Sequence, residues 1–283
     1  MSGEERTITQ TLDGIDSQAS WLDEREQRRM SFSYAIADAR VMVARSLRHT
    51  VRNVDVMLTA VMLPVVLMLM FVYVFGGAMD TGTAEYVNYV VPGIILLCAG
   101  FGAASTALSV AGDMEHGIVA RFKSMPITSS AVVTGHVVAS VVRNLVATAL
   151  VIGVAFAVGW RPDATVAEWV AALGFVVLFI LAISWLSAAF GLLLKTVEAA
   201  NAYTFVLLFL PYVSSAFVPT STMPSGLHSF AEHQPVTPVI ETLRGLWMGT
   251  PIDDNALLAI AWCGGILALS YTWAIWLFRR TSN

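Results

Sequence analysis

The sequence predicts an all-α integral membrane protein with six transmembrane helices. Of its 283 residues, 57% are hydrophobic and 13% are charged, whereas soluble domains have about 25% charged residues. Nearly half of the charged residues precede Val56, so the chain beyond that residue is apolar enough to lie in lipid. A span needs about 20 apolar residues, and six stretches of that kind follow. This composition excludes an ordinary soluble protein.

Two segments are expected before the first span. Residues 1–30 are acidic and poor in apolar residues, which indicates a flexible cytoplasmic tail; a secretory signal would open on basic and then apolar residues. Residues 31–55 predict an interfacial amphipathic helix, because apolar and basic side chains fall on different faces at helical spacing. A simple orientation signal explains the same arginines equally well. The apolar face comprises Val43, Leu47, Val51 and Val54, and the basic face comprises Arg45, Arg48 and Arg52.

The six spans are expected within residues 56–283. The fifth is the shortest and is followed by Pro219 and Pro224, so it can bend or stop early. Because the number of spans is even, both termini are expected on one side. The spans are Val56 to Gly76, Tyr89 to Ala111, Val137 to Gly159, Trp169 to Leu194, Ala202 to Val218 and Ala256 to Phe278.

The positions of Lys and Arg predict which side that is, because cytoplasmic loops retain these residues. With the N-terminus inside, only Arg161 and Arg244 lie outside, and Arg143 lies within the third span. All the other Lys and Arg residues then lie on the inner side. We therefore expect a multi-pass protein of the cell membrane with both termini in the cytoplasm.

The sequence carries no motif for catalysis or metal binding. Residues 191–196 suggest a phosphate loop, but Leu194 stands where that loop needs a glycine before its lysine. Lys195 is better explained as an interfacial lysine at the end of the fourth span. Cys98 and Cys263 lie in apolar runs, so neither a disulfide framework nor a metal site is expected. We expect a chain that is not an enzyme and has no cofactor of its own.

Arg143 is the one ionised side chain that lies well inside a predicted span. An intramembrane charge is by default a functional hypothesis. Its position, about two turns from the cytoplasmic end of the span, would let its long stem snorkel to the interface, and His136 would lie in the headgroup region. We favour a structural role for Arg143.

The loop between the second and third spans is short, charged and cytoplasmic. Glu115 can stand near a helix start, and Pro126 would end the helix that the pattern predicts. An apolar edge beside two cations suits docking into a groove of a soluble partner. The edge comprises Ile118, Val119 and Phe122, and the cations are Arg121 and Lys123.

Residues 219–255, between the fifth and sixth spans, contain five prolines. This segment is too long for a simple turn and too broken for a span. Glu241 and Arg244 stand at i, i+3 and can pair on one helical face. Such a pair would be a gate element if it were buried at membrane depth and would contribute little if exposed; we favour the gate.

Small residues mark the second span and aromatic residues mark the fifth. Small side chains, among them Gly100 and Gly102, permit close helix approach. The aromatic residues would form an uncharged wall that suits a large amphipathic cation or a lipid, although contact with membrane lipid is the commoner explanation of such a stripe. They are Tyr203, Phe205, Phe209, Tyr212 and Phe217.

Two segments resemble motifs of type-2 ABC exporter permeases. Residues 115–127, EHGIVARFKSMPI, resemble the E-x-G…R…P segment between the second and third spans of that family. Residues 232–244, EHQPVTPVIETLR, are similar to its N-P-[LV]-[ST]-x…E-x-[LA]-R stretch, with Gln234 where the family usually has Asn. The second motif is closest to the daunorubicin and doxorubicin resistance branch of multidrug permeases. The resemblance implies that residues 56–283 form a six-span permease domain.

The resemblance implies roles for three groups of residues. The first motif would form the coupling helix that contacts an ATPase subunit, and the second would belong to short re-entrant helices that cover the substrate path before the last span. The second and fifth spans would line the dimer interface and that path. Coupling would involve Glu115, Gly117, Arg121, Phe122, Lys123 and Pro126. The outer gate motif would comprise Pro235, Thr237, Glu241 and Arg244. The path would be lined by Tyr203, Phe205, Phe209 and Tyr212.

The function that the resemblance implies is that of a membrane-spanning permease subunit of an ATP-driven exporter. It would move drugs or other amphipathic, lipophilic molecules out of the cytoplasm or the inner leaflet. The expected partners are two copies of an ABC ATPase subunit, a second copy of this chain or a related permease, and the lipid bilayer. ATP and Mg would be bound by the ATPase subunits. No nucleic acid is expected as a partner. Export of a lipid-linked glycan or a cell-envelope lipid is the alternative within the family. A stand-alone secondary transporter is less favoured because the predicted spans lack carboxylates, and a membrane anchor without transport would leave the cytoplasmic loop unexplained.

Overall fold

The computed structural model describes residues 54–76, 86–117 and 129–280, and within these ranges every regular element is a helix. The all-α class is confirmed for this part of the chain. The predicted tail (1–30) and nearly all of the predicted interfacial helix (31–55) lie outside it. The elements are α3 (Val54–Met70), the π-helical turn η1 (Phe71–Phe75), α4 (Tyr86–Glu115), α6 (Ser129–Val158), α7 (Val166–Leu194), α8 (Val197–Phe209), the 3-10 turns η2 (Leu210–Val213) and η3 (Thr220–Thr222), α9 (Ser225–His233), α10 (Val236–Met248) and α11 (Asn255–Arg280).

Four of the described helices, α4, α6, α7 and α11, are long and apolar enough to cross a membrane, judged by length and composition. They coincide with the second, third, fourth and sixth predicted spans. The first and fifth predicted spans fall on two shorter apolar helices, residues 61–75 and 197–213. Both are irregular. Helix α3 contains Pro64 and is followed by the π-helical turn η1. Helix α8 is followed by the 3-10 turn η2 at Pro211, and a proline has no N–H to donate to a helix.

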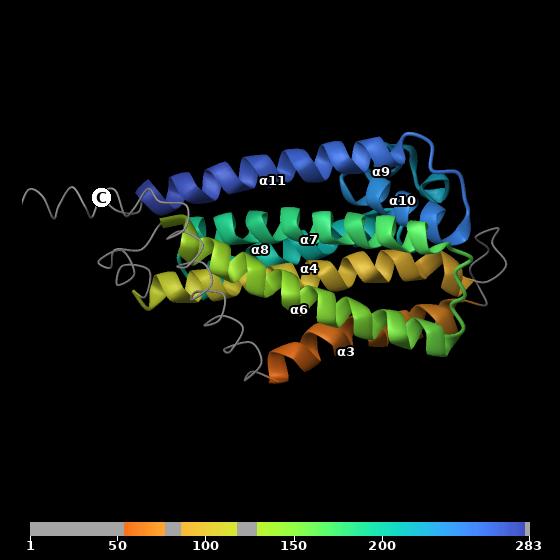
Figure 1. Cartoon of the computed structure of the whole chain (residues 1–283), viewed down its shortest axis with the longest axis horizontal. Helices are drawn as coiled ribbons and strands as arrows, with labels where there is room; N and C mark the ends of the chain where they lie inside the picture. The colour runs from red at the N-terminus through yellow and green to blue at the C-terminus, as the bar shows by residue number, and fades with distance from the viewer. Residues whose placement is uncertain (1–53, 77–85, 118–128, 281–283) are drawn as a thin grey trace, which may run out of the picture.

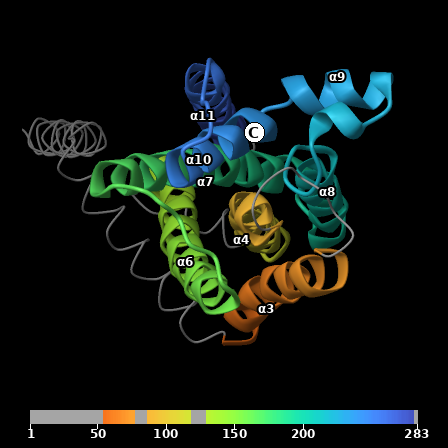
Figure 2. The same ribbon diagram turned by 90° about the vertical axis from the view of Figure 1, so that its right-hand side faces the viewer.

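The central helix of the bundle is α4. Figure 2, which views the bundle along its length, shows α3, α6, α7 and α8 arranged around it. Residues 94–99 of α4 are completely buried. Glycines allow its neighbours to approach closely: a Cβ atom at Gly93 would lie 2.6 Å from Ala216 Cβ, and one at Gly102 would lie 1.7 Å from Asn144 Oδ1. The prediction that small residues permit close approach along this span is confirmed at Gly102.

Different helices lie at the two ends of the bundle. In Figure 1, α9 and α10 lie at one end, which we call the α10 end. The opposite end contains the last turn of α4, the start of α6, the connection between α7 and α8 and the C-terminal end of α11; we call it the Glu115 end. The segment before the last predicted span, where the resemblance implies short re-entrant helices, contains the short helices α9 and α10.

Three tryptophans pack against one another at the α10 end. Trp160, which follows α6, and Trp247 of α10 are completely buried, with ring centroids 5.3 Å apart and ring planes at 86°. Trp169 of α7 packs against both, with its ring centroid 5.9 Å from Trp160 and 5.5 Å from Trp247. Aromatic pairs of this kind contribute about 0.5–1.5 kcal/mol beyond their burial. The cluster therefore attaches α10 to α6 and α7.

Two residues, Lys195 and Thr196, connect α7 to α8 at the Glu115 end. Lys195 has a φ of +60°, and its N–H donates to the carbonyl of Gly191, so α7 ends at Leu194 as predicted. Thr196 Oγ1 accepts a hydrogen bond of 3.3 Å from the N–H of Ala199 and caps α8. The short connection allows α8 to return along the bundle beside α4.

Candidate functional site

The first motif begins at the C-terminal end of α4. Glu115 is the last residue of that helix, and Gly117 follows with a φ of +67°, a left-handed conformation that favours glycine. The N–H of Gly117 donates to the carbonyl of Met114 at 3.1 Å. The glycine two residues after the glutamate therefore ends the helix. The other residues predicted for coupling lie outside the described residues; they are Arg121, Phe122, Lys123 and Pro126.

Glu115 contacts the start of α8. Its Oε2 atom accepts a hydrogen bond of 3.1 Å from the backbone N–H of Val197. Val197 is the first residue of α8, and the first N–H groups of a helix have no partner within it. Sequence reasoning missed this contact, because a bond between positions 82 residues apart leaves no local pattern.

A second polar contact at the Glu115 end joins α6 to α4. His136 Nε2 lies 3.1 Å from Asp113 Oδ2, and the two side chains are 13% and 16% exposed. Asp113 stands two residues before Glu115, so α4 binds α6 and α8 through carboxylates on its last turn. These contacts position the end of α4 from which the predicted coupling segment continues.

Arg143 of α6 turns towards α4. Its Nη2 atom donates to the carbonyl oxygen of Gly102 at 3.0 Å and lies 3.4 Å from Thr106 Oγ1, and the residue is 9% exposed. The prediction that Arg143 snorkels to the interface is wrong, because the missing side chain of Gly102 leaves the backbone of α4 accessible to the guanidinium group. None of the ion pairs among the described residues includes Arg143.

A buried polar cluster accompanies this arginine where α4, α6 and α7 meet. Ser140 is at its centre: its Oγ atom accepts from Thr106 at 2.7 Å and from the Asn144 amide at 3.3 Å, and it lies 3.0 Å from Ser184 Oγ. Polar side chains join neighbouring helices in this way in membranes. Within the described part of the chain, the buried atoms of α6 that have no hydrogen-bond partner are Arg143 Nε, Asn144 Oδ1 and Thr148 Oγ1.

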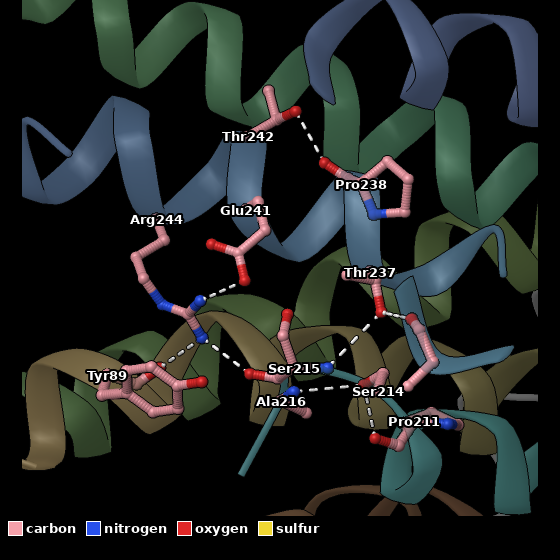
Figure 3. A network of polar contacts seen from close by, with 11 residues as sticks. Tyr89, Pro211, Ser214, Ser215, Ala216, Thr237, Pro238, Glu241, Thr242 and Arg244 are labelled. Atoms are coloured by element: carbon pink, nitrogen blue, oxygen red, sulfur yellow. Dashed lines mark hydrogen bonds and ion pairs between the residues drawn. The ribbon is translucent and has the colours of Figure 1, made fainter. Parts of the chain in front are cut away.

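Arg244 is the centre of a polar network at the α10 end (Figure 3). Its Nη2 atom donates to the carbonyl oxygens of Ser215 at 2.9 Å and Tyr89 at 3.1 Å, and its Nη1 atom lies 2.6 Å from Glu241 Oε1. The side chain of Arg244 is 6% exposed and that of Glu241 is 28% exposed. Arg244 is therefore buried and Glu241 is partly buried, and the role of the pair as a gate at membrane depth stays a prediction.

The first turn of α10 contacts the same segment after α8. Pro235 precedes α10 with a φ of −62°, which suits the ring of proline at a helix start. Thr237 Oγ1 donates to the carbonyl of Ala231 and accepts from the N–H of Ser215 at 3.4 Å. Thr237 and Arg244 thus contact the two backbone groups of Ser215, as Figure 3 shows.

Gln234 gives the second motif a contact with the end of α8. Its Nε2 atom donates to the carbonyl oxygens of Leu210, at 3.2 Å, and of Val213. Carbonyl groups at a helix end lack partners in the helix, so the amide caps the 3-10 turn that follows α8. Glutamine, which stands where the resembled family usually has asparagine, therefore has a defined structural role here.

The four aromatic residues predicted to line a substrate path do not share one environment. Phe205 and Phe209 are 71% and 64% exposed and Tyr212 is 38% exposed. Tyr203 packs against α7 instead, with its ring centroid 4.2 Å from that of Phe190. Residues two positions apart lie on nearly opposite sides of a helix, which separates Tyr203 from Phe205.

Phe217 stacks between two irregular turns at the α10 end. Its ring centroid lies 4.3 Å from that of Phe71 in η1 and 5.3 Å from that of Tyr212 in η2. Its carbonyl oxygen accepts a hydrogen bond of 2.8 Å from the hydroxyl of Tyr86. The sequence placed Phe217 in the aromatic band, but Phe71 and Tyr86 carry no motif and were missed.

Exposed apolar side chains are found on most of the described helices, and α3, η1 and α8 carry one group of them. The resemblance implied that the second span lines a dimer interface together with the fifth, but α4 is enclosed by its neighbours, and for this helix the expectation is wrong. Large side chains at least 50% exposed on these three elements are Met62, Val66, Tyr73, Val74, Phe205, Val206 and Phe209.

An all-helical bundle with four helices long and apolar enough to cross a bilayer belongs to the class of multi-pass membrane proteins. Residues 38–248, which include both motifs, match the family model described as ABC-2 type transporter. The chain belongs to the ABC-2 type transporter family, and the resemblance drawn from the two motifs is confirmed.

Two relatives have names that agree with this assignment. The chain is 27% identical over 221 residues, 78% of each protein, to a daunorubicin resistance ABC transporter permease protein of Streptomyces coeruleorubidus. It is 24% identical over 253 residues, 87% of this chain and 92% of the relative, to a protein of Mycobacterium tuberculosis named probable doxorubicin resistance ABC transporter permease protein. Both relatives are thus named as permeases of ABC transporters.

Proposed function

We propose that this chain is the membrane-spanning permease subunit of an ATP-driven exporter. Its membership of the ABC-2 type transporter family carries the proposal, and the names of its relatives as permease proteins support it. The proposed substrates are drugs or other amphipathic, lipophilic molecules taken from the cytoplasm or the inner leaflet. Separate ATPase subunits would bind ATP and Mg and hydrolyse the nucleotide.

The proposed topology has six spans within residues 56–283. In it, α3 with η1 is the first span and α8 with η2 is the fifth, in addition to the four longer helices. Lys195 and the two arginines in the last turn of α11 lie at the Glu115 end, which supports a cytoplasmic position for that end. Both termini would then be cytoplasmic and the protein would reside in the cell membrane.

The proposed complex contains two permeases and two ATPase subunits. Each ATPase subunit would dock on the predicted coupling residues that follow Glu115. A second copy of this chain, or a related permease, would cover part of the apolar surface of α3, η1 and α8, where Tyr73 is 70% and Phe205 is 71% exposed. An apolar face of this kind is suited to a partner helix or to lipid.

The proposed substrate path runs beside α8 and ends at the Arg244 network. Phe205, Phe209 and Tyr212 would line it, with Tyr203 on the α7 side. The outer gate would comprise Arg244, Glu241 and the first turn of α10, with Pro235 and Thr237. The geometry around Arg244 supports the assignment of the gate, because the buried guanidinium joins α10 to α4 and to the segment after α8.

Reconstitution of the chain with its ATPase subunit in lipid vesicles tests the proposal. We expect ATP-dependent extrusion of an anthracycline or a cationic dye, and loss of extrusion with ATP hydrolysis retained after deletion of residues 121–124. Extrusion by the chain alone without ATP would contradict the proposal and indicate a secondary transporter. Transport of a fluorescent lipid-linked glycan, with no transport of drugs, would replace the proposed substrate by the alternative within the family.

A further inference from the structure

One helix connects the two candidate sites. The N–H of Val197, the first residue of α8, donates a hydrogen bond to Glu115, at the start of the predicted coupling segment. At the other end of the bundle, Gln234 donates to a carbonyl of η2. Ser215, just after η2, donates its N–H to Thr237 and accepts from Arg244 at its carbonyl oxygen. Figure 1 shows α8 running along the bundle between these ends.

The contact between Glu115 and α8 is a helix cap supplied by another helix. Thr196 caps the N–H of Ala199 at 3.3 Å, and the Glu115 carboxylate accepts the N–H of Val197 at 3.1 Å. A carboxylate is favoured at a helix N-terminus by the backbone dipoles as well as by the hydrogen bond. The exposed Glu115 side chain therefore joins the end of α4 directly to the start of α8.

Close packing supports this hydrogen bond. A Cβ atom at Gly112 of α4 would lie 3.7 Å from Val197 Cγ2, and Ala107, Ala111 and Ala200 form a small buried cluster between α4 and α8. Small side chains place the two helices in direct contact with few rotamers to absorb a displacement. A movement of the last turn of α4 would therefore displace the first turn of α8.

The connection to α7 allows such a displacement. Only Lys195 and Thr196 separate α7 from α8, while α7 itself is anchored because a Cβ atom at Gly191 would lie 2.7 Å from the carbonyl oxygen of Ala107. Two residues outside the helices can absorb changes in φ and ψ. The start of α8 can thus pivot while α7 stays against α4.

We propose that Glu115 is a positioning residue that transmits movement of the coupling segment to α8, and through α8 to the Arg244 network. The proposal rests on the proposed function, since it assigns the route by which a bound ATPase would act on the outer gate. In this view Glu115 acts on α8 of its own chain, and the ATPase contacts the residues that follow it.

The test compares Glu115→Ala, Glu115→Gln and the control Glu198→Ala in the reconstituted complex. Glu198 is an exposed carboxylate in the first turn of α8, and none of the described hydrogen bonds or ion pairs uses its side chain. We expect Glu115→Ala to bind the ATPase subunit and hydrolyse ATP as the native complex does, with extrusion reduced at least about fivefold. Glu115→Gln should retain most extrusion, because its amide oxygen can still accept the Val197 N–H. Glu198→Ala should match the native chain.

Two results would overturn the proposal. Native extrusion by Glu115→Ala would show that the contact transmits nothing, and loss of ATPase binding in that variant would make Glu115 a docking contact. Failure of the native complex to extrude any substrate with ATP would instead count against the proposed function, so the two failures are distinguishable.

Amide hydrogen exchange of the purified chain provides a readout that does not need transport. Glu115→Ala should accelerate exchange at Val197, whereas Glu198→Ala and Glu115→Gln should leave it close to native. Native protection of Val197 in Glu115→Ala would also overturn the proposal.

Discussion

The guanidinium group of Arg244 contacts Tyr89 twice. Its Cζ atom lies 3.8 Å from the centre of the tyrosine ring, and its Nη2 atom donates to the carbonyl oxygen of the same residue at 3.1 Å. The planar group also binds Ser215 and Glu241, which uses its several N–H donors together with its flat face. A single side chain of α10 thereby fixes three separate parts of the chain.

Replacement of Arg244 should destabilise the protein strongly. Arg244→Ala leaves the partly buried Glu241 carboxylate without its cation, and breaking a buried ion pair costs about 3–5 kcal/mol. Arg244→Lys should also lower stability, because an ammonium group cannot stack on Tyr89 and serve the same acceptors. Thermal unfolding in detergent, followed by tryptophan fluorescence, measures both. Glu241→Gln, which keeps an acceptor, should cost less than Arg244→Ala; the reverse order would contradict the role of the guanidinium as the centre of the network.

Replacement of Arg143 should have the opposite effect on stability. This buried guanidinium has no carboxylate partner among the described residues, so its replacement by an apolar side chain removes a desolvated charge without leaving an unpaired carboxylate behind. We expect Arg143→Met to unfold at the native temperature or above it in the same assay. A loss of stability as large as that of Arg244→Ala would refute this. Loss of ATP-dependent extrusion in a stable Arg143→Met variant would show that the arginine acts in transport.

Gly93 should not tolerate a methyl group. A Cβ atom there would lie 2.7 Å from Ala216 Cα and 2.9 Å from its carbonyl oxygen, so the segment that carries Ser215 would have to move. Overpacking of this kind costs about 1–3 kcal/mol, which unfolding of Gly93→Ala would measure. Gly100→Ala on the same helix is the matched control, because its Cβ atom would make an ordinary contact of 3.5 Å with Leu208. Equal stability of the two variants would exclude the close approach at Gly93.

Two phenylalanines should respond differently to truncation. Phe217 is 5% exposed and stacks between Phe71 and Tyr212, and replacing a buried phenylalanine by alanine costs about 3–5 kcal/mol. Phe205 is 71% exposed, so Phe205→Ala should leave the unfolding temperature of the monomer in detergent almost unchanged. If Phe205→Ala were the more destabilising of the two, the assignment of the exposed and buried faces around α8 would be wrong.

Apolar periodicity and length predict the long helices of this protein well. The fourth predicted span ends at Leu194, where α7 ends, because Lys195 both marks the interface and adopts a left-handed conformation. Helix α4 extends beyond its predicted span at both ends, and α6 begins before its predicted span, since polar residues such as Asp113 continue a helix that has left the apolar stretch. The early end of α8 follows from Pro211, in agreement with the shortness of the fifth predicted span.

The site contacts were less predictable because many of them use the backbone. Arg244 binds the carbonyl groups of Tyr89 and Ser215, and Glu115 binds the N–H of Val197. A backbone partner leaves no residue type in the sequence that would reveal it. The direction of Arg143 also depends on which neighbour lacks a side chain, and that is a property of the packed helices.

The enclosed position of α4 has a consequence for biosynthesis. This helix leaves the ribosome before α6, α7 and α8 exist, and the roughly 90 residues up to the end of α8 take on the order of 10 seconds to synthesise at about 5–20 residues per second. During that interval the nascent helix must be stable in lipid without the neighbours that later cover it. Residues 94–99, which are completely buried in the finished protein, therefore have to be as compatible with acyl chains as with protein. The apolar sequence of α4 meets the demands of co-translational insertion first and of packing afterwards.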